Sequence, residues 1–188
     1  TPEMMGIVLS AFFWSYALLQ IPAGWVADKC GQKIGLGIAV GSWSLATAAT
    51  GLATGFASLV GLRVALGVGE AGAYPANAGI ASKWFPDKER ATISGLFDSA
   101  SKFGGAVAMP LIVTLMMTFD WRMTFVIVGL TGLVWSLIWW WYFSDTPEKH
   151  RSANAAEVEY IRGGQTQQHG VDATIPMKWY ELLKYRNI

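Results

Sequence analysis

Polar side chains recur at helical spacing within one long apolar segment. They are Arg63, Glu70, Tyr74 and Asn77, separated by seven, four and three residues. At about 100° per residue in an α-helix, these side chains share one face. Arg63 could attract an anion, and Glu70 could take up and release a proton, because a carboxyl in a low-dielectric site favours its neutral form. A buried Arg63–Glu70 ion pair that only locks helices together is the alternative.

A second charged pair lies in the next apolar segment. Asp98 and Lys102 are four residues apart and therefore on one face of a helix. One interpretation is an ion pair whose two charges neutralise each other. The other is that Lys102 faces a cavity as a second cation for an anion, with Asp98 holding it in place.

A tight charged turn separates the first two apolar segments. It reads Asp28-Lys29-Cys30-Gly31-Gln32-Lys33, an acid and two bases around a glycine. Gly31 can adopt a left-handed conformation, and Asp28 could face the amino end of a neighbouring helix, where a carboxylate is favoured. An ordinary charged turn between two helices is the alternative.

The segments that carry these residues are long enough to cross a membrane. A spanning helix needs about 20 predominantly apolar residues. Segments of this kind lie at about 4–26, 34–53, 57–82, 91–119 and 123–143. They predict an all-α membrane protein with a transmembrane bundle over residues 1–143. The polar remainder, 144–188, predicts a loop with a short helix near 153–161 and an amphipathic segment on the membrane surface over 177–188.

Basic residues gather on one side of the predicted bundle. They lie in the turns after the first and third spans and in the tail: Lys29, Lys33, Lys83, Lys88, Arg90, Lys149, Arg151, Arg162, Lys178, Lys184 and Arg186. The opposite side offers only Arg122. Because cytoplasmic loops are enriched in Lys and Arg, we expect these turns and residues 144–188 to be cytoplasmic.

Composition excludes several other functions. The chain is 53% hydrophobic with a net charge of +1, so no basic field favours nucleic acid. One cysteine and two separated histidines predict neither a disulfide nor a metal site. The run Gly67-Val68-Gly69 lies inside a predicted span, so it is no dinucleotide fingerprint and no cofactor is expected. No nucleophile–base set is visible, so we do not expect an enzyme.

Several motifs resemble a known family. The pattern Gly-x-x-x-Asp-Lys-x-Gly-x-Lys over residues 24–33 resembles the cytoplasmic-loop motif of the major facilitator superfamily. The patterns at 16–25, 63–76 and 84–91 resemble the anion:cation symporter family within it, and Pro110-Leu111 and Trp121-Arg122 agree. The similarity runs from about residue 10 to 164. Within the family, the sequence looks most like bacterial proton-coupled sugar-acid carriers for galactonate, glucarate or hexuronates.

The resemblance implies a fold and a function. The five spans would be the second to sixth of a twelve-span carrier, in its amino-terminal half. The chain opens at Thr1 without a start Met, so we expect a fragment that lacks the first span, with 144–188 leading to the missing second half. The implied function is proton-coupled symport of a sugar acid across the cell (inner) membrane, in contact with lipid and the remaining spans. Another carboxylate or a phosphate-type anion, a channel and a non-transporting membrane protein are the alternatives.

The resemblance also assigns roles to residues. It implies that Tyr16 and Arg63 contact the substrate and that Glu70 is a protonation site. The polar face and the second charged pair extend the predicted substrate site to Tyr74, Asn77 and Lys102, with possible support from Gln20 and Asp98. The resemblance makes the turn residues a latch on the cytoplasmic gate: Asp28, Lys29, Gly31 and Lys33.

Overall fold

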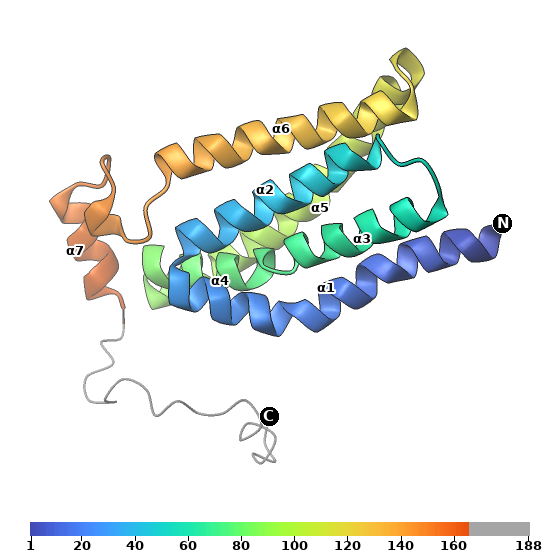
Figure 1. Ribbon diagram of the computed structural model, residues 1–188. Coiled ribbons are helices and arrows are strands. Elements are labelled where there is room, and N and C mark those ends of the chain that lie inside the picture. Colours follow the sequence, from blue (N-terminus) through green and yellow to red (C-terminus); the bar gives the residue numbers. More distant parts are fainter. Residues whose placement is uncertain (166–188) are drawn as a thin grey trace, which may run out of the picture.

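The computed structural model describes residues 1–165, and their regular elements are all helices. Figure 1 shows long helices lying side by side and short ones gathered at one end of the bundle. The helices are α1 (Pro2–Cys30), α2 (Gln32–Thr50), α3 (Phe56–Glu70), α4 (Ala73–Trp84), α5 (Asp87–Thr118), α6 (Trp121–Tyr142), the 3₁₀-helix η1 (Pro147–Lys149) and α7 (Ala155–Gly163). The predicted short helix near 153–161 is α7, and the predicted surface segment over 177–188 lies outside the described residues.

Four stretches of the described chain are long and apolar enough to span a membrane: α1, α3 with α4, α5 and α6. The remaining predicted span, 34–53, is helical as α2 but is not among the four. Helix α2 lies between α6 and α3 (Figure 1) and has the most buried residues of these helices. Because its neighbours are protein, small and weakly polar residues such as Ser44 and Thr50 replace the large apolar side chains that lipid would favour.

The third predicted span, 57–82, is broken in two. Helix α3 ends at Glu70, a turn follows at Ala71 and Gly72, and α4 begins at Ala73. Pro75 explains the break, because its nitrogen carries no hydrogen and its ring would clash with the carbonyl of Ala71 in a continuous helix. The predicted span at 57–82 thus corresponds to α3 and α4 together, with a break that the sequence analysis did not predict.

Glycines bring the long helices close together. A Cβ added at Gly67 would lie 2.6 Å from the carbonyl oxygen of Phe12 in α1. One added at Gly69 would lie 2.8 Å from the backbone nitrogen of Trp43 in α2. These residues face opposite sides of α3, so α3 is held between α1 and α2. Small residues at such contacts allow the backbone approach on which helix association in membranes depends.

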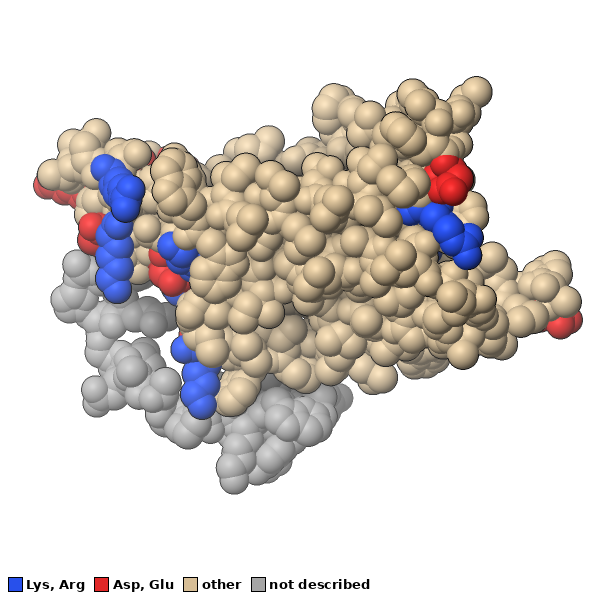
Figure 2. All heavy atoms as spheres, turned by 45° about the horizontal axis from the view of Figure 1, so that its top comes forward, with Lys and Arg blue, Asp and Glu red and all other residues tan. Residues whose placement is uncertain are grey.

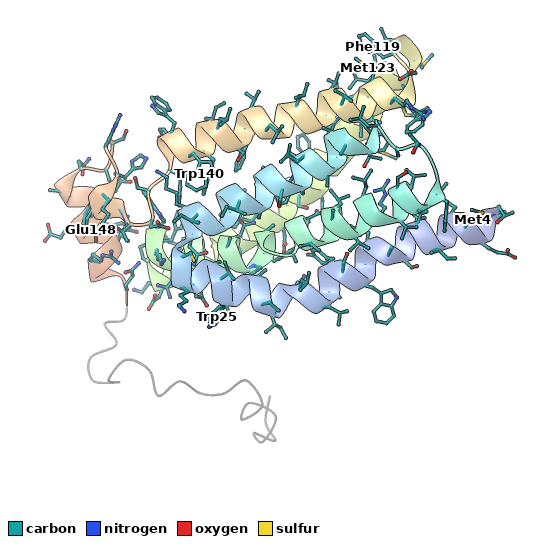
Figure 3. All side chains as sticks on the ribbon, viewed as in Figure 1. Met4, Trp25, Phe119, Met123, Trp140 and Glu148 are labelled. Carbon is teal, nitrogen blue, oxygen red and sulfur yellow. The ribbon has the colours of Figure 1, made fainter. Side chains whose placement is uncertain are left out.

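The two ends of the bundle carry the charged side chains. Figure 2 shows Lys, Arg, Asp and Glu at both ends and a face without charge between them. Met4, Phe119 and Met123 mark one end, and Glu148 lies at the other, beside α7 (Figure 3). We call these the Arg122 end and the α7 end. An uncharged face between two charged ends is typical of a bundle that crosses a bilayer.

Residues 144–165 fasten helices together at the α7 end. The side-chain amide of Gln165 donates to the carbonyl oxygen of Ser82 at 3.1 Å, and the backbone N–H of Asp87 donates to that of Gly164 at 3.0 Å. Arg162 pairs with Glu148 at 2.5 Å, and its guanidinium lowers the pKa of that carboxyl to about 2. The short helices after α6 are thereby tied to the turn between α4 and α5.

Candidate functional site

A cavity of about 280 Å³ opens between α1, the α3–α4 break and α5. We call it the carboxyl cavity, because Glu70 and Asp98 both line it. Its walls are formed by Tyr16, Glu70, Ala73, Tyr74, Asn77, Ala78, Ser94, Phe97, Asp98 and Ser101. The cavity therefore brings together Tyr16, Glu70, Tyr74 and Asn77, which the sequence predicted to share a site.

The break in the third span positions the α4 side of this cavity. Glu70 is the last residue of α3, and Tyr74 and Asn77 lie on the first two turns of α4. A discontinuous helix at the middle of a bundle is a recurring feature of transporter binding sites. The half-buried Tyr16 closes the cavity from α1, where its ring stacks on Phe12 with centroids 5.6 Å apart.

Helix α5 supplies the opposite wall. Ser94, Asp98 and Ser101 are spaced by four and three residues, so their side chains share the face that packs on α4. The hydroxyl of Tyr74 donates to Oδ1 of Asp98 at 3.5 Å, which links the two helices across the cavity. The sequence predicts for Asp98 either an ion pair with Lys102 or a supporting role beside it, and not a contact with Tyr74.

Arg63 lies apart from the cavity and does not pair with Glu70. The two residues are separated by two turns of α3, about 10 Å along the axis, and no ion pair joins them within residues 1–165. The Nε of Arg63 is buried, and no group in the described chain accepts a hydrogen bond from it. The alternative of a locking ion pair therefore finds no support in this geometry.

Asp98 and Lys102 also remain unpaired in the described part of the chain. Lys102 is exposed, one turn from Asp98 along α5, and it does not line the carboxyl cavity. Gln20 is half-buried on α1 and does not line it either. The interpretation of a self-neutralising ion pair thus finds no support in the described residues, and Asp98 faces Tyr74 instead.

A larger cavity of about 810 Å³ lies between α2, α4 and α6 and reaches the α7 end. Its walls are mostly apolar and aromatic, with Trp43, Trp84, Trp135 and Trp139 among them. Asn77 borders both cavities. A wall of this kind suits the packing of apolar side chains better than the binding of an anion. Sequence reasoning did not find this cavity, because its walls come from residues far apart in the chain.

The charged turn after α1 is held by a residue that sequence reasoning missed. Gly31 has φ = 93°, the left-handed conformation expected for it. The backbone N–H of Lys33 donates to Oδ1 of Asp145 at 2.8 Å, so Asp145 supplies the carboxylate at the amino end of α2. The sequence allowed Asp28 to take such a position, but its side chain is exposed and makes no hydrogen bond within residues 1–165. Lys29 lies over the ring of Trp25 at 4.8 Å.

Metal ligands do not gather anywhere in the described chain. Within residues 1–165, no three or more His, Cys, Asp or Glu side chains come together as a metal site would require.

Comparisons with known proteins agree on one kind of molecule. The family model described as Major Facilitator Superfamily matches residues 1–187. The chain is 40% identical to a D-galactonate transporter of Escherichia coli over 164 residues, 87% of this chain and 38% of that protein. It is 36% identical to a galacturonate transporter of Dickeya chrysanthemi, over 98% of this chain and 53% of that protein. A probable sulfoacetate transporter of Cupriavidus necator is 37% identical, over 98% of this chain and 43% of that protein.

Solved structures that match the chain are also those of a transporter. A bacterial homolog of the human lysosomal transporter Spinster, inward-facing and occupied, matches with a TM-score of 0.57 and 30% identity. That match covers 76% of this chain and 36% of the other. The chain thus spans about half or less of the length of the proteins that it matches.

Proposed function

Since the chain belongs to the major facilitator superfamily, we propose that it forms part of a carrier that moves a sugar acid together with protons. As a member of that family with several membrane-spanning helices, it is a multi-pass membrane transporter chain and not an enzyme. The substrate, the coupling ion and the roles of individual residues are the proposal.

The observation that carries the proposal is that Arg63 and Glu70 share a helix but do not neutralise each other. An unpaired guanidinium is suited to a carboxylate, because it is weakly hydrated and can bind both oxygens. Glu70 ends α3, where the last backbone carbonyls favour a proton donor over an anion. The pair therefore supports an anion contact at Arg63 and a proton site at Glu70.

We propose that transport follows alternating access. Protonation of Glu70 and binding of the anion would together permit closure, and loss of the proton would follow opening to the other side. Tyr16, Tyr74 and Asn77 would hold the substrate from α1 and α4, and Lys102 would be a second cation for it. The turn with Asp28, Lys29, Gly31 and Lys33 would act as the gate latch, with Asp145 holding it from the end of α6.

The names of relatives support the substrate class. They include transporters for D-galactonate, galacturonate and hexuronate, which are sugar acids. The probable sulfoacetate transporter supports a second candidate, another small organic anion. We favour the sugar acid, because the hydroxyl, amide and carboxyl groups of the carboxyl cavity are suited to hydroxyl groups.

Substitutions at Arg63 and Glu70 test this proposal, because they should fail differently. Arg63→Ala in the full-length carrier should abolish binding and both transport modes, since the buried anion loses its counter-charge. Glu70→Gln imitates the protonated carboxyl, so it should keep binding and anion exchange but lose uphill uptake. Counterflow and proton-driven uptake of labelled sugar acids should be measured side by side in liposomes.

Matched controls are available at exposed positions. Glu3→Gln and Arg151→Ala change the same groups outside the proposed site and should leave both activities unchanged. Each variant must first elute as a folded monodisperse species. If Glu70→Gln still concentrates substrate with protons, Glu70 is not the coupling site. If wild type takes up no member of the panel, the substrate class is wrong.

A further inference from the structure

We propose that Asp98 restricts the carrier to sugar acids with a single carboxylate and rejects sugar diacids. This inference rests on the proposed function and adds the substrate class within it. It follows from the placement of charge along the bundle and from the groups that surround Asp98.

On both α3 and α5, the cation and the carboxyl lie at different heights along the bundle axis. Helix α3 runs from the Arg122 end towards the α7 end, so Arg63 lies nearer the Arg122 end than Glu70 (Figure 1). Helix α5 runs in the opposite direction, so Lys102 lies nearer the Arg122 end than Asp98. Each cation thus lies nearer the Arg122 end than the carboxyl on its own helix, by about 10 Å along α3 and about 6 Å along α5.

The carboxyl cavity offers hydroxyl and amide partners but no cation. Its lining contains no Lys or Arg. Around Asp98 lie the hydroxyl of Tyr74, which donates to its carboxylate, and Ser94 and Ser101 on the same face of α5. A carboxylate among hydroxyls accepts hydrogen bonds from the hydroxyl groups of a sugar. It does not favour a second anion.

A sugar acid with one carboxylate suits both the cations and the carboxyl cavity. Its carboxylate would lie towards Arg63 and Lys102, and its hydroxyl-bearing chain would extend into the carboxyl cavity. A diacid of the same length would place its second carboxylate against Asp98. Proton uptake by Glu70 removes one negative charge from the cavity but leaves that of Asp98. The repulsion between like charges then opposes binding of the diacid.

The test compares acids that differ only in the last carbon. Galactonate and galactarate share their stereochemistry, and the second carries an additional carboxylate. Each should compete with labelled galactonate for the full-length carrier in liposomes. We expect wild type to bind the monoacid at least about tenfold better, the effect of one poorly placed like charge. Asp98→Asn should reduce that ratio several-fold, mainly by improving the diacid, whereas Asp98→Glu should preserve it.

Asp120→Asn is the matched control, because it removes a carboxylate at the Arg122 end but keeps a side-chain acceptor for Met123. It should leave the ratio unchanged. Equal competition by both acids in wild type, or an unchanged ratio in a folded Asp98→Asn, overturns the inference while leaving the proposed function intact. If Asp98→Asn does not fold, the same ratio is measured for Asp98→Ser and compared with the wild-type ratio. Failure of wild type to transport either acid would instead count against the proposed function.

Discussion

At the scale of single residues, the hydrogen bond of residues 1–165 with the greatest sequence separation joins Asp145 to the turn after α1. Its carboxylate accepts the N–H of Lys33, 112 residues earlier, and a Cβ at Gly31 would lie only 2.8 Å from its Oδ2. The left-handed Gly31 thus leaves room for the carboxylate that caps α2. The charged turn and the end of α6 consequently form one unit.

Replacing Asp145 should loosen this unit. Asp145→Ala leaves the amino end of α2 without its acceptor and should cost about 1 kcal/mol of folding free energy, as the loss of a helix cap does. Asp145→Asn keeps an acceptor oxygen and should cost less. Thermal unfolding of the purified carrier in detergent, followed by circular dichroism, measures both.

Asp28→Asn provides the comparison. The side chain of Asp28 makes no hydrogen bond within residues 1–165, so this change should leave the melting temperature nearly unchanged. It should alter the transport rate if Asp28 acts in the gate latch. A loss of stability equal to that of Asp145→Ala would contradict the assignment of the cap to Asp145.

At the scale of elements, helix contact through glycine decides how the bundle is assembled. Helix α3 contacts α1 at Gly67 and α2 at Gly69, while α6 contacts α2 at Gly129, where a Cβ would lie 2.6 Å from the carbonyl oxygen of Ser44. The contacts at Gly67 and Gly69 set the rotation of α3 about its axis. That rotation in turn directs Glu70 into the carboxyl cavity.

Gly67→Ala should therefore disturb more than one helix. Its Cβ would collide with the backbone of α1, so α3 must shift, at a cost of about 1–3 kcal/mol typical of overpacking. Gly61→Ala is the matched control in the same helix, because nothing lies within 4 Å of its added Cβ. Melting temperatures of the two variants should differ clearly, and equal values would show that α3 is not tightly held.

At the scale of the whole molecule, the distribution of charge indicates orientation. The helix ends that carry Lys29, Lys33, Lys88 and Lys149 lie at the α7 end, whereas Asp120 and Arg122 are at the start of α6, at the other end (Figure 1). By the bias of Lys and Arg towards cytoplasmic loops, the α7 end should face the cytoplasm. The latch residues would then close the cytoplasmic side of the carrier.

Cysteine labelling tests this orientation. In a Cys30→Ser background, Lys88→Cys, Asp120→Cys and Lys149→Cys would each be exposed to an impermeant maleimide in intact cells. Only the cysteine at position 120 should react, and those at 88 and 149 should react after the membrane is permeabilised. The reverse pattern would invert the orientation and move the latch to the outer side.

Taken by itself, the sequence determined the features that depend on neighbouring residues. Apolar runs indicated the membrane helices, and the spacing of Glu70, Tyr74 and Asn77 placed them on one face. Both inferences rest on helix periodicity and on the cost of burying charge in lipid, which act locally. The unpredicted break before Pro75 has a local cause as well, but the length and apolar character of a segment do not reveal it.

Only the tertiary structure decided which distant side chains meet. It left Arg63 and Glu70 unpaired, turned Asp98 towards Tyr74 instead of Lys102, and brought Asp145 to the amino end of α2. Spacing along a helix limits which residues share a face. It does not say how far each helix is rotated against its neighbours. That rotation follows from the packing of residues such as Gly67 and Gly69 against other helices, and no local pattern contains it.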